Sequence, residues 1–230
     1  INGGVVHQII RNLIMKIDLT EVNKIWINLA EDTSKKESML EQFNSYEMNN
    51  HIRFDGIKNE NSVLGCGLSM YGALDYAKQN LPCLVLEDDA RILDEFFHTE
   101  IEVPDETDAI YLGVSHWGMA EGKEASTLNG IGREVINENL FRINSMCSLH
   151  AVLYITEEYV TASMEAVKQR NDLNTNPEYV GNAGHVDIGT ALIQKDFFVV
   201  APTTPYFYQD CPRNKIFTRV PLNYSIGIKQ

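Results

Sequence analysis

Three consecutive carboxylates, Glu87, Asp88 and Asp89, directly follow the short apolar run of residues 84–86. An apolar run that comes after a proline is typical of a strand buried on both faces of a mostly parallel sheet. Ligands of open α/β sheets bind beyond the carboxyl ends of the strands, and clustered carboxylates repel one another unless a positive group lies between them. The pattern therefore indicates a divalent cation, held by carboxylate oxygens against a phosphate-bearing ligand.

The same acids have a simpler interpretation, in which they belong to a solvated turn. Asp88 or Asp89 would then cap a helix that begins near Arg91, because acidic side chains are favoured at helix N-termini. Spacing alone does not separate the two interpretations, so the rest of the sequence must.

Composition narrows the classes of partner. The chain has 230 residues, of which 44% are apolar and 22% charged, and its net charge is −13. These values are typical of one globular domain with a substantial core, and the negative charge argues against nucleic acid or an anionic membrane as a partner. An acidic protein that binds a diphosphate needs local positive charge, which a metal ion would supply. No stretch approaches the ~18 apolar residues of a membrane-spanning helix, so we expect no transmembrane segment.

The spacing of the cysteines indicates whether the protein works in a reducing or an oxidising cellular compartment. They are far apart and form no zinc-ligand pattern, which predicts free thiols in a reducing compartment: Cys66, Cys83, Cys147 and Cys211. The apolar segment 9–17 is interrupted by polar residues and is a poor signal peptide. We therefore expect a cytoplasmic location.

We expect an N-terminal extension over residues 1–23, with Met15 as a candidate start, and a single domain over residues 24–230. Strand and helix patterns alternate in that domain, which predicts an α/β fold with a mostly parallel central sheet and helices on both faces. The predicted strands are 24–29, 51–54, 84–86, 109–113, 150–155 and 197–202. Helices are predicted after residues 34, 65, 91, 156 and 185, and a hairpin around 137–139. The stretches 113–132 and 171–184 are predicted loops, the second a candidate lid.

The glycine-rich stretch from Gly65 to Gly72 does not fit a dinucleotide-binding loop, because no apolar strand precedes it. It predicts instead a helix whose small residues let the backbone pass close to a ligand or to the sheet.

Eight short segments resemble, in order, the motifs of family 25 glycosyltransferases, the group that includes lipooligosaccharide and collagen galactosyltransferases. They are Ile27–Leu29, Phe54–Ile57, Gly65–Ser69, Leu84–Asp89, Ala109–Gly113, His150–Tyr154, Val186–Asp187 and Pro205–Gln209. The resemblance implies a single GT-A-like (Rossmann-like) domain, a UDP-sugar donor, Mn²⁺ or Mg²⁺, and inversion at the anomeric carbon. The acceptor would be a glycan or glycoconjugate, as in lipopolysaccharide biosynthesis, and the hexose galactose or glucose.

Carried over to this sequence, the resemblance implies Glu87 and Asp89 as metal ligands. The expected contacts to the nucleotide sugar are Asn28, Leu29, Phe54, Asp55, Gly56, Ser69 and Asp88. Asp187 is the candidate catalytic base, because it follows the candidate lid and opens a helix where an anion is favoured. The alternative is that Asp187 only caps that helix.

Two departures from the family pattern stand out. Lys35 and Lys36 are present where the family has an arginine, and a lysine lacks the bidentate fork of a guanidinium. Met70 is present where the family has a histidine. These differences keep open a non-catalytic nucleotide- or glycan-binding module, and the same acids would also suit a metal-dependent phosphoesterase or phosphotransferase.

The remaining histidines and aromatics have more than one interpretation. His150 is expected to lie in or next to the core, and His185 to be structural or to offer a nitrogen to the metal. His116 and Trp117 would either stack on an acceptor sugar or pack locally.

Overall fold

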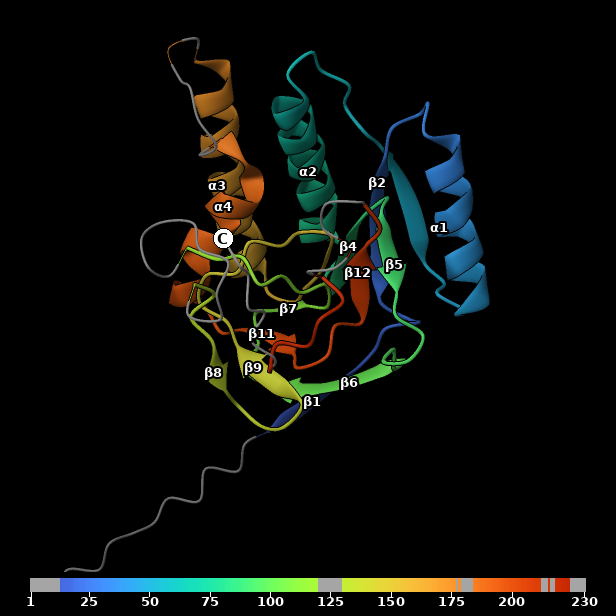
Figure 1. Ribbon diagram of the computed structural model, residues 1–230, viewed down its shortest axis with the longest axis vertical. Helices are drawn as coiled ribbons and strands as arrows, with labels where there is room; N and C mark the ends of the chain where they lie inside the picture. Colours follow the sequence, from blue (N-terminus) through green and yellow to red (C-terminus); the bar gives the residue numbers. More distant parts are fainter. Residues whose placement is uncertain are drawn as a thin grey trace, which may run out of the picture.

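The computed structural model describes residues 13–119, 130–176, 178, 184–211, 215 and 218–223 (Figure 1). Within these residues the main element is an eight-stranded sheet. From one edge to the other its strands are β3 (His51–Asp55), β2 (Asn23–Asn28), β4 (Cys83–Glu87), β10 (Ala151–Tyr154), β7 (Ala109–Tyr111), β11 (Val199–Pro202), β9 (Leu140–Arg142) and β8 (Glu134–Val135).

The α/β class is confirmed, but the sheet is mixed rather than mostly parallel. Strands β3, β2 and β4 are mutually parallel, and so are β7 and β11. Strand β10 is antiparallel to both β4 and β7, and β9 is antiparallel to β11 and β8. Parallel neighbours need a crossover, which α1 and α2 supply for the first three strands. Strand β10 enters instead from the irregular segment 143–150, which lets it run in the opposite direction.

Helices cover both faces of the sheet, as expected. Alternate residues of β2 and β4 point to opposite sides: Ile25 and Val85 to one, Trp26 and Leu84 to the other. The first side packs against α2 (Ser62–Gln79), α3 (Glu157–Thr175) and α4 (Val186–Ile193), which is followed by the short 3₁₀ helix Gln194–Asp196. The second packs against α1 (Thr33–Ser45), on the opposite side of β2 and β4 in Figure 1.

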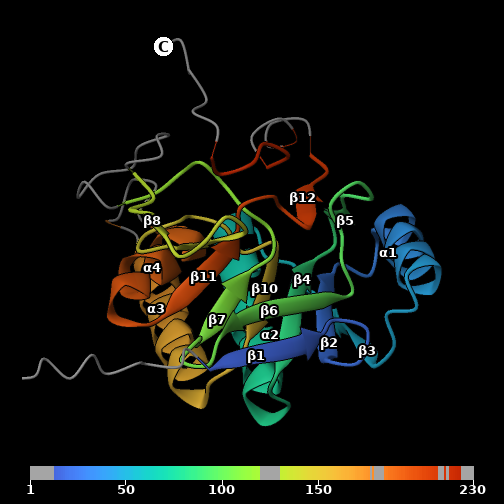
Figure 2. The ribbon, with the colours of Figure 1, turned by 90° about the horizontal axis from the view of Figure 1, so that it is seen from below.

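A two-stranded ribbon adds to the face that α1 covers. Strand β1 (Ile14–Asp18) pairs antiparallel with β6 (Glu100–Pro104), and both run across the front of the main sheet in Figure 2. Ile17 and Leu19 are buried in the same cluster as Trp26. Part of the expected N-terminal extension therefore packs into the core of the domain.

The expected helix after Arg91 is wrong. Residues Ala90–Ile92 form strand β5, which pairs antiparallel with β12 (Phe207–Gln209), so that Ala90 lies opposite Gln209. The apolar residues after Arg91 were compatible with either structure, and packing of Phe97 on Tyr206 and Phe207 favours the strand and turn. Asp88 and Asp89 therefore form a turn between two strands, and the interpretation of these acids as helix caps is wrong.

Other local predictions are confirmed with shifted boundaries. Helix α2 begins before Gly65, because the Asn61 side chain accepts hydrogen bonds from the backbone N–H groups of Val63 and Leu64. Thr156 caps α3, and β8 and β9 form the expected hairpin. Helix α3 continues into the first part of the candidate lid. Two parts of the predicted loops lie outside the described residues: 177 and 179–183 in the candidate lid, and 120–129 in the long loop.

All four cysteines are free thiols. In the described parts of the chain, every helix is too short or too polar to span a lipid bilayer.

Candidate functional site

Two cavities meet at the carboxyl end of β4. The Lys35 cavity, of about 410 Å³, lies between the ends of β2 and β4 and the start of α2, and its lining includes Asn28, Lys35, Lys58, Asp88 and Asp89. The Asp187 cavity, of about 480 Å³, is lined by Ser115, Trp117, His150, His185, Asp187 and Gln209 among others. Ser62, Cys66 and Glu87 line both cavities. The two spaces therefore adjoin at Glu87.

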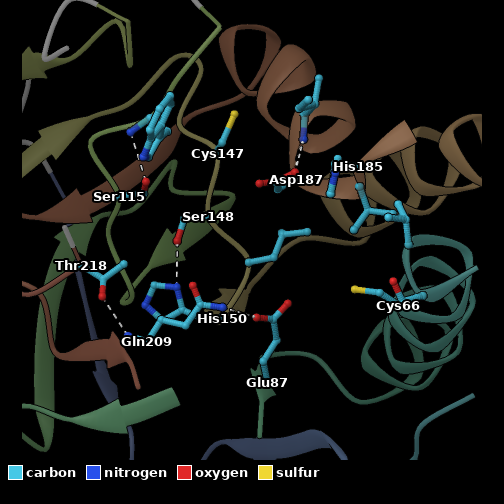
Figure 3. A pocket seen from close by; sticks show the side chains of 16 residues that line it. Cys66, Glu87, Ser115, Cys147, Ser148, His150, His185, Asp187, Gln209 and Thr218 are labelled. Atoms are coloured by element: carbon cyan, nitrogen blue, oxygen red, sulfur yellow. Dashed lines mark hydrogen bonds between the residues drawn. The ribbon is translucent and has the colours of Figure 1, made fainter. Parts of the chain in front are cut away.

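Glu87, the last residue of β4, is the central acid of this arrangement (Figure 3). Its backbone N–H donates to the carbonyl oxygen of His150 at 3.0 Å, and its Oε2 accepts a hydrogen bond of 3.2 Å from Nε2 of Gln209. Burial raises the pKa of Glu87 to about 8, and the carboxylates of Asp89 and Asp187 add to this effect. A buried acid held among other acids is stabilised in its ionised form when a cation binds beside it.

Asp89 has an oxygen without a protein partner. Its Oδ1 is buried and makes no hydrogen bond within the described residues. Burial raises the pKa of Asp89, Asp88 raises it further, and Lys35 opposes the change. The backbone oxygen of Asp89 accepts a 2.7 Å hydrogen bond from the N–H of Asp210, which fixes the turn.

Glu87 and Asp89 suit a hard divalent cation. Their oxygens are the ligands that Mg²⁺ and Mn²⁺ prefer, and the unpartnered Oδ1 of Asp89 lies at a cavity wall. Among the described residues, no three His, Cys, Asp or Glu side chains gather as a complete ligand set. A site with one or two carboxylates is usual for Mg²⁺, because substrate phosphates and water complete its coordination.

Asp88 has a different environment from its two neighbours. Its Oδ1 accepts from Nζ of Lys35 at 2.8 Å, and its Oδ2 accepts from Nδ2 of Asn28 at 2.9 Å. The oxygen of the Asn28 amide accepts in turn from Arg53 at 3.1 Å. Both oxygens of the middle acid, Asp88, are thus bound to protein side chains.

Two lysines bring positive charge to the Lys35 cavity. Burial by itself would lower the pKa of Lys35. The carboxylates of Asp88, Asp89 and Asp32 outweigh that effect and raise the pKa, so this side chain is a stable cation. Lys58 also lines the cavity and pairs with Glu31. Lys58 was not among the expected contacts, although its position just past the end of β3 indicates this edge of the sheet.

Leu29, Gly56 and Ser69 line the Lys35 cavity, at the positions expected for contacts to a nucleotide sugar. Ser69 fixes the wall: its Oγ donates to the carbonyl oxygen of Gly65 and accepts from the N–H of Ile57, both at 2.7 Å. The N–H of Gly56 donates to the carbonyl oxygen of Asn28 at 2.9 Å. Hydrogen bonds thus join α2, the end of β3 and the end of β2 around one space.

Phe54 and Asp55 do not line either cavity. The ring of Phe54 packs on Gly72 of α2, where an added Cβ would lie only 2.4 Å from Phe54 Cζ. The side chain of Asp55 is 73% exposed and pairs with Arg53. The structure thus separates these two residues from the other expected nucleotide contacts.

Asp187 lies in the first turn of α4 and lines the second cavity (Figure 3). The N-cap position belongs to His185, whose side chain makes no capping hydrogen bond. Oδ1 of Asp187 accepts from the N–H of Ile188 at 2.9 Å. Figure 3 shows Asp187 and Glu87 reaching this cavity from α4 and β4, with Cys66 contributed by α2. Their charges interact, since Asp187 contributes to the raised pKa of Glu87.

The structure places Trp117, His116 and His150 in different environments. Trp117 lines the Asp187 cavity, whereas His116 is buried and its Nε2 lies 3.2 Å from the carbonyl oxygen of Val220. His150 is 2% exposed, and burial lowers its pKa to about 4. It is therefore neutral at pH 7, as suits a residue next to the core.

A scan of the chain against models of known protein families finds no match, and a search of curated proteins finds no relative. The resemblance to family 25 glycosyltransferases therefore rests on the ordered motifs.

Proposed function

We propose that this protein is a metal-dependent, inverting glycosyltransferase with a GT-A-like fold, similar to family 25 enzymes. It would move a hexose, galactose or glucose, from a UDP-sugar to a hydroxyl of a glycan or glycoconjugate. One observation carries the proposal: the half-buried Glu87 lies where a lysine-lined cavity and a second cavity with its own carboxylate meet, and Asp89 lines the first of the two.

The Lys35 cavity suits the nucleotide diphosphate. Its volume of about 410 Å³ lies in the usual range of small-molecule sites. Lys35 and Lys58 provide positive charge for phosphate oxygens, while Leu29 and Gly56 form walls at the ends of β2 and β3. Asn28 holds Asp88 and Lys35 in place through the Asp88 carboxylate.

Glu87 and Asp89 would hold the Mn²⁺ or Mg²⁺ ion. When bound, such an ion neutralises the charge that develops on the diphosphate leaving group. Burial is the main cause of the raised pKa of both acids, and the Asp89 carboxylate adds to that of Glu87. A cation bound beside them would favour their ionised forms.

Asp187 would act as the general base from the second cavity. In an inverting transfer, the acceptor oxygen bonds to the anomeric carbon as the bond from that carbon to the phosphate oxygen breaks. The UDP leaves with the electron pair of that bond, and the hydroxyl proton passes to the Asp187 carboxylate. A positioned base of this kind contributes about 10²–10⁴-fold to the rate.

The test measures UDP release from UDP-galactose and UDP-glucose with and without MnCl₂. We expect metal-dependent release that EDTA abolishes and that Asp89→Asn reduces by about 100-fold or more. Asp105→Asn, a change of an exposed acid in the turn after β6, is the matched control and should leave the rate unchanged. Asp187→Asn should retain UDP binding but lose sugar transfer.

Other outcomes would select other functions. Phosphate release from simple phosphate esters would indicate a phosphoesterase. Metal-independent UDP binding, unchanged by Asp89→Asn and without UDP-sugar turnover, would indicate a non-catalytic binding module.

A further inference from the structure

One face of α1 contacts the acidic turn of residues 87–89 and the strand β5 that follows it. Residues 35, 39 and 42 lie one and two helical turns apart, so their side chains share that face. Nζ of Lys35 donates to Oδ1 of Asp88 at 2.8 Å, and Sδ of Met39 lies 3.3 Å from Nη1 of Arg91. Figure 1 and Figure 2 both show α1 beside β5. The helix that carries Lys35 therefore also supports the segment that follows the acids.

Gln42, the third residue of that face, takes the place of a neighbouring strand. Its side chain is buried. Its Oε1 accepts a 2.7 Å hydrogen bond from the N–H of Ile92, and its Nε2 donates to the carbonyl oxygen of Ala90 at 3.4 Å. A parallel strand makes the same two bonds on either side of one residue of its partner. Strand β5 pairs with β12 at one edge, and the Gln42 amide holds its other edge.

Arg91, the residue between these two bonds, extends the support to the acids. Its Nη1 donates to the carbonyl oxygens of Asp88 at 3.0 Å and of Ala90 at 2.9 Å. Asp89 lies between those two carbonyl groups, and its Oδ1 is buried without a hydrogen-bond partner among the described residues. The backbone on both sides of the expected metal ligand is therefore tied, through Arg91 and Ala90, to Gln42.

We propose that Gln42 is a positioning residue for the metal site: it fixes the segment 88–92 so that the Asp89 carboxylate faces the cation. Gln42 lines neither cavity, so it would act through the backbone and not by contact with the metal or the nucleotide. This inference rests on the proposed function, which assigns the metal to Glu87 and Asp89. It adds that one rigid helix both supports the metal ligand and presents Lys35 to the diphosphate, which sets the distance between the two.

The test compares two substitutions at neighbouring buried positions of α1. Gln42→Met keeps the length of the side chain and removes both hydrogen bonds to β5. Phe43→Leu is the matched control, because it removes part of a buried ring that packs on Trp26 and His51. Electron paramagnetic resonance of the free ion measures Mn²⁺ affinity, without nucleotide and with UDP.

Gln42→Met should weaken Mn²⁺ binding by about 10-fold, the usual effect of losing a group that supports a metal ligand. Phe43→Leu should leave the Mn²⁺ affinity unchanged, even where its loss of stability is the larger. A residue that only stabilised the fold would not produce this difference.

A second measurement uses the wild-type protein. If the bond from Ile92 to Gln42 favours metal binding, bound Mn²⁺ must in turn favour that bond. Exchange of the Ile92 amide hydrogen with deuterium should therefore slow by about 10-fold when Mn²⁺ is added. The Phe198 amide is the control, since a side-chain oxygen, Oδ2 of Asp108, also accepts from it at 2.8 Å. Its exchange rate should not change.

Wild-type Mn²⁺ affinity in Gln42→Met, an equal loss in Phe43→Leu, or an Ile92 exchange rate that does not respond to Mn²⁺ would each overturn the inference. With metal-dependent UDP release intact, such results would leave the proposed function standing. The expected losses of affinity in a protein that turns over no UDP-sugar would reject the transferase and keep the role of Gln42. Absence of Mn²⁺ binding by the wild type, with and without UDP, would overturn both.

Discussion

Oε2 of Glu87 accepts a 3.2 Å hydrogen bond from the side-chain amide of Gln209, which lies 122 residues later in the chain. The same C-terminal strand also holds the acidic turn by its backbone. Gln209 pairs with Ala90 in the β5–β12 ladder, and the N–H of Asp210 donates to the carbonyl oxygen of Asp89. Both acids expected to bind metal are therefore positioned by residues 209 and 210.

Gln209→Ala should destabilise the metal-free protein, because it removes the amide donor from the half-buried carboxylate of Glu87. The expected loss is about 1–3 kcal/mol in the free energy of unfolding. Gln209→Glu should cost more, since it places another acid beside Glu87, and it should regain more stability than the wild type when Mn²⁺ is added. Urea unfolding with and without MnCl₂ measures both effects. Gln79→Ala removes an exposed glutamine side chain on α2 and serves as the control. Equal losses for positions 79 and 209 would contradict this role of Gln209.

Lys35→Ala should weaken UDP binding by about 10- to 100-fold, the usual effect of removing a charged hydrogen-bond donor. The loss also frees the Asp88 carboxylate, which would then repel the diphosphate. Lys36→Ala, which changes an exposed neighbour on the same helix, should leave the affinity unchanged. Titration calorimetry with UDP and MnCl₂ provides both dissociation constants. Similar losses for the two variants would place the diphosphate away from Lys35.

The acidic turn could be located from sequence because its signal is local. An apolar run that ends in Glu87-Asp88-Asp89 marks a strand end, and strand ends of one sheet share an edge with residues such as Asn28 and Gly56. Ser69 was expected only through the resemblance to family 25 glycosyltransferases, and it lies on the helix that packs beside that edge.

The features that sequence did not reveal depend on long-range contacts. The apolar run of β10 fits a parallel or an antiparallel central strand equally well, and only its neighbours set the direction. Arg91 begins a segment whose apolar spacing suits a helix, yet pairing with β12 makes it a strand. The contact between Gln209 and Glu87 likewise depends on how the C-terminal segment returns to the sheet.

Phe54 and Gly72 should behave as a coupled packing pair. Phe54→Ala should destabilise the protein by about 2 kcal/mol, because the half-buried ring fills space against α2, and it should leave the affinity for UDP unchanged. Gly72→Ala should destabilise the wild type, since its Cβ would lie 2.4 Å from Phe54 Cζ. In the Phe54→Ala background the same change should stabilise by about 1 kcal/mol, the helix preference of alanine over glycine. Chemical denaturation of the four proteins gives the coupling, and additive effects, or weaker UDP binding by Phe54→Ala, would contradict this assignment.

His150 should make the protein less stable as the pH falls from 7 to 5. Burial lowers its pKa from 6.5 to about 4, so the folded state keeps this ring neutral while the unfolded state takes up a proton. Protons therefore favour unfolding below pH 6.5, and His150 lowers the free energy of unfolding by about 2 kcal/mol between pH 7 and pH 5.

The His150 ring has little room to change its contacts, with Nδ1 3.1 Å from Ser148 Oγ and Nε2 3.4 Å from the carbonyl oxygen of Phe207. His150→Asn should be less stable than the wild type at pH 7 but should lose about 2 kcal/mol less on acidification. Urea titrations at both pH values measure the difference, and parallel pH profiles for the two proteins would show that the folded state accommodates a protonated His150.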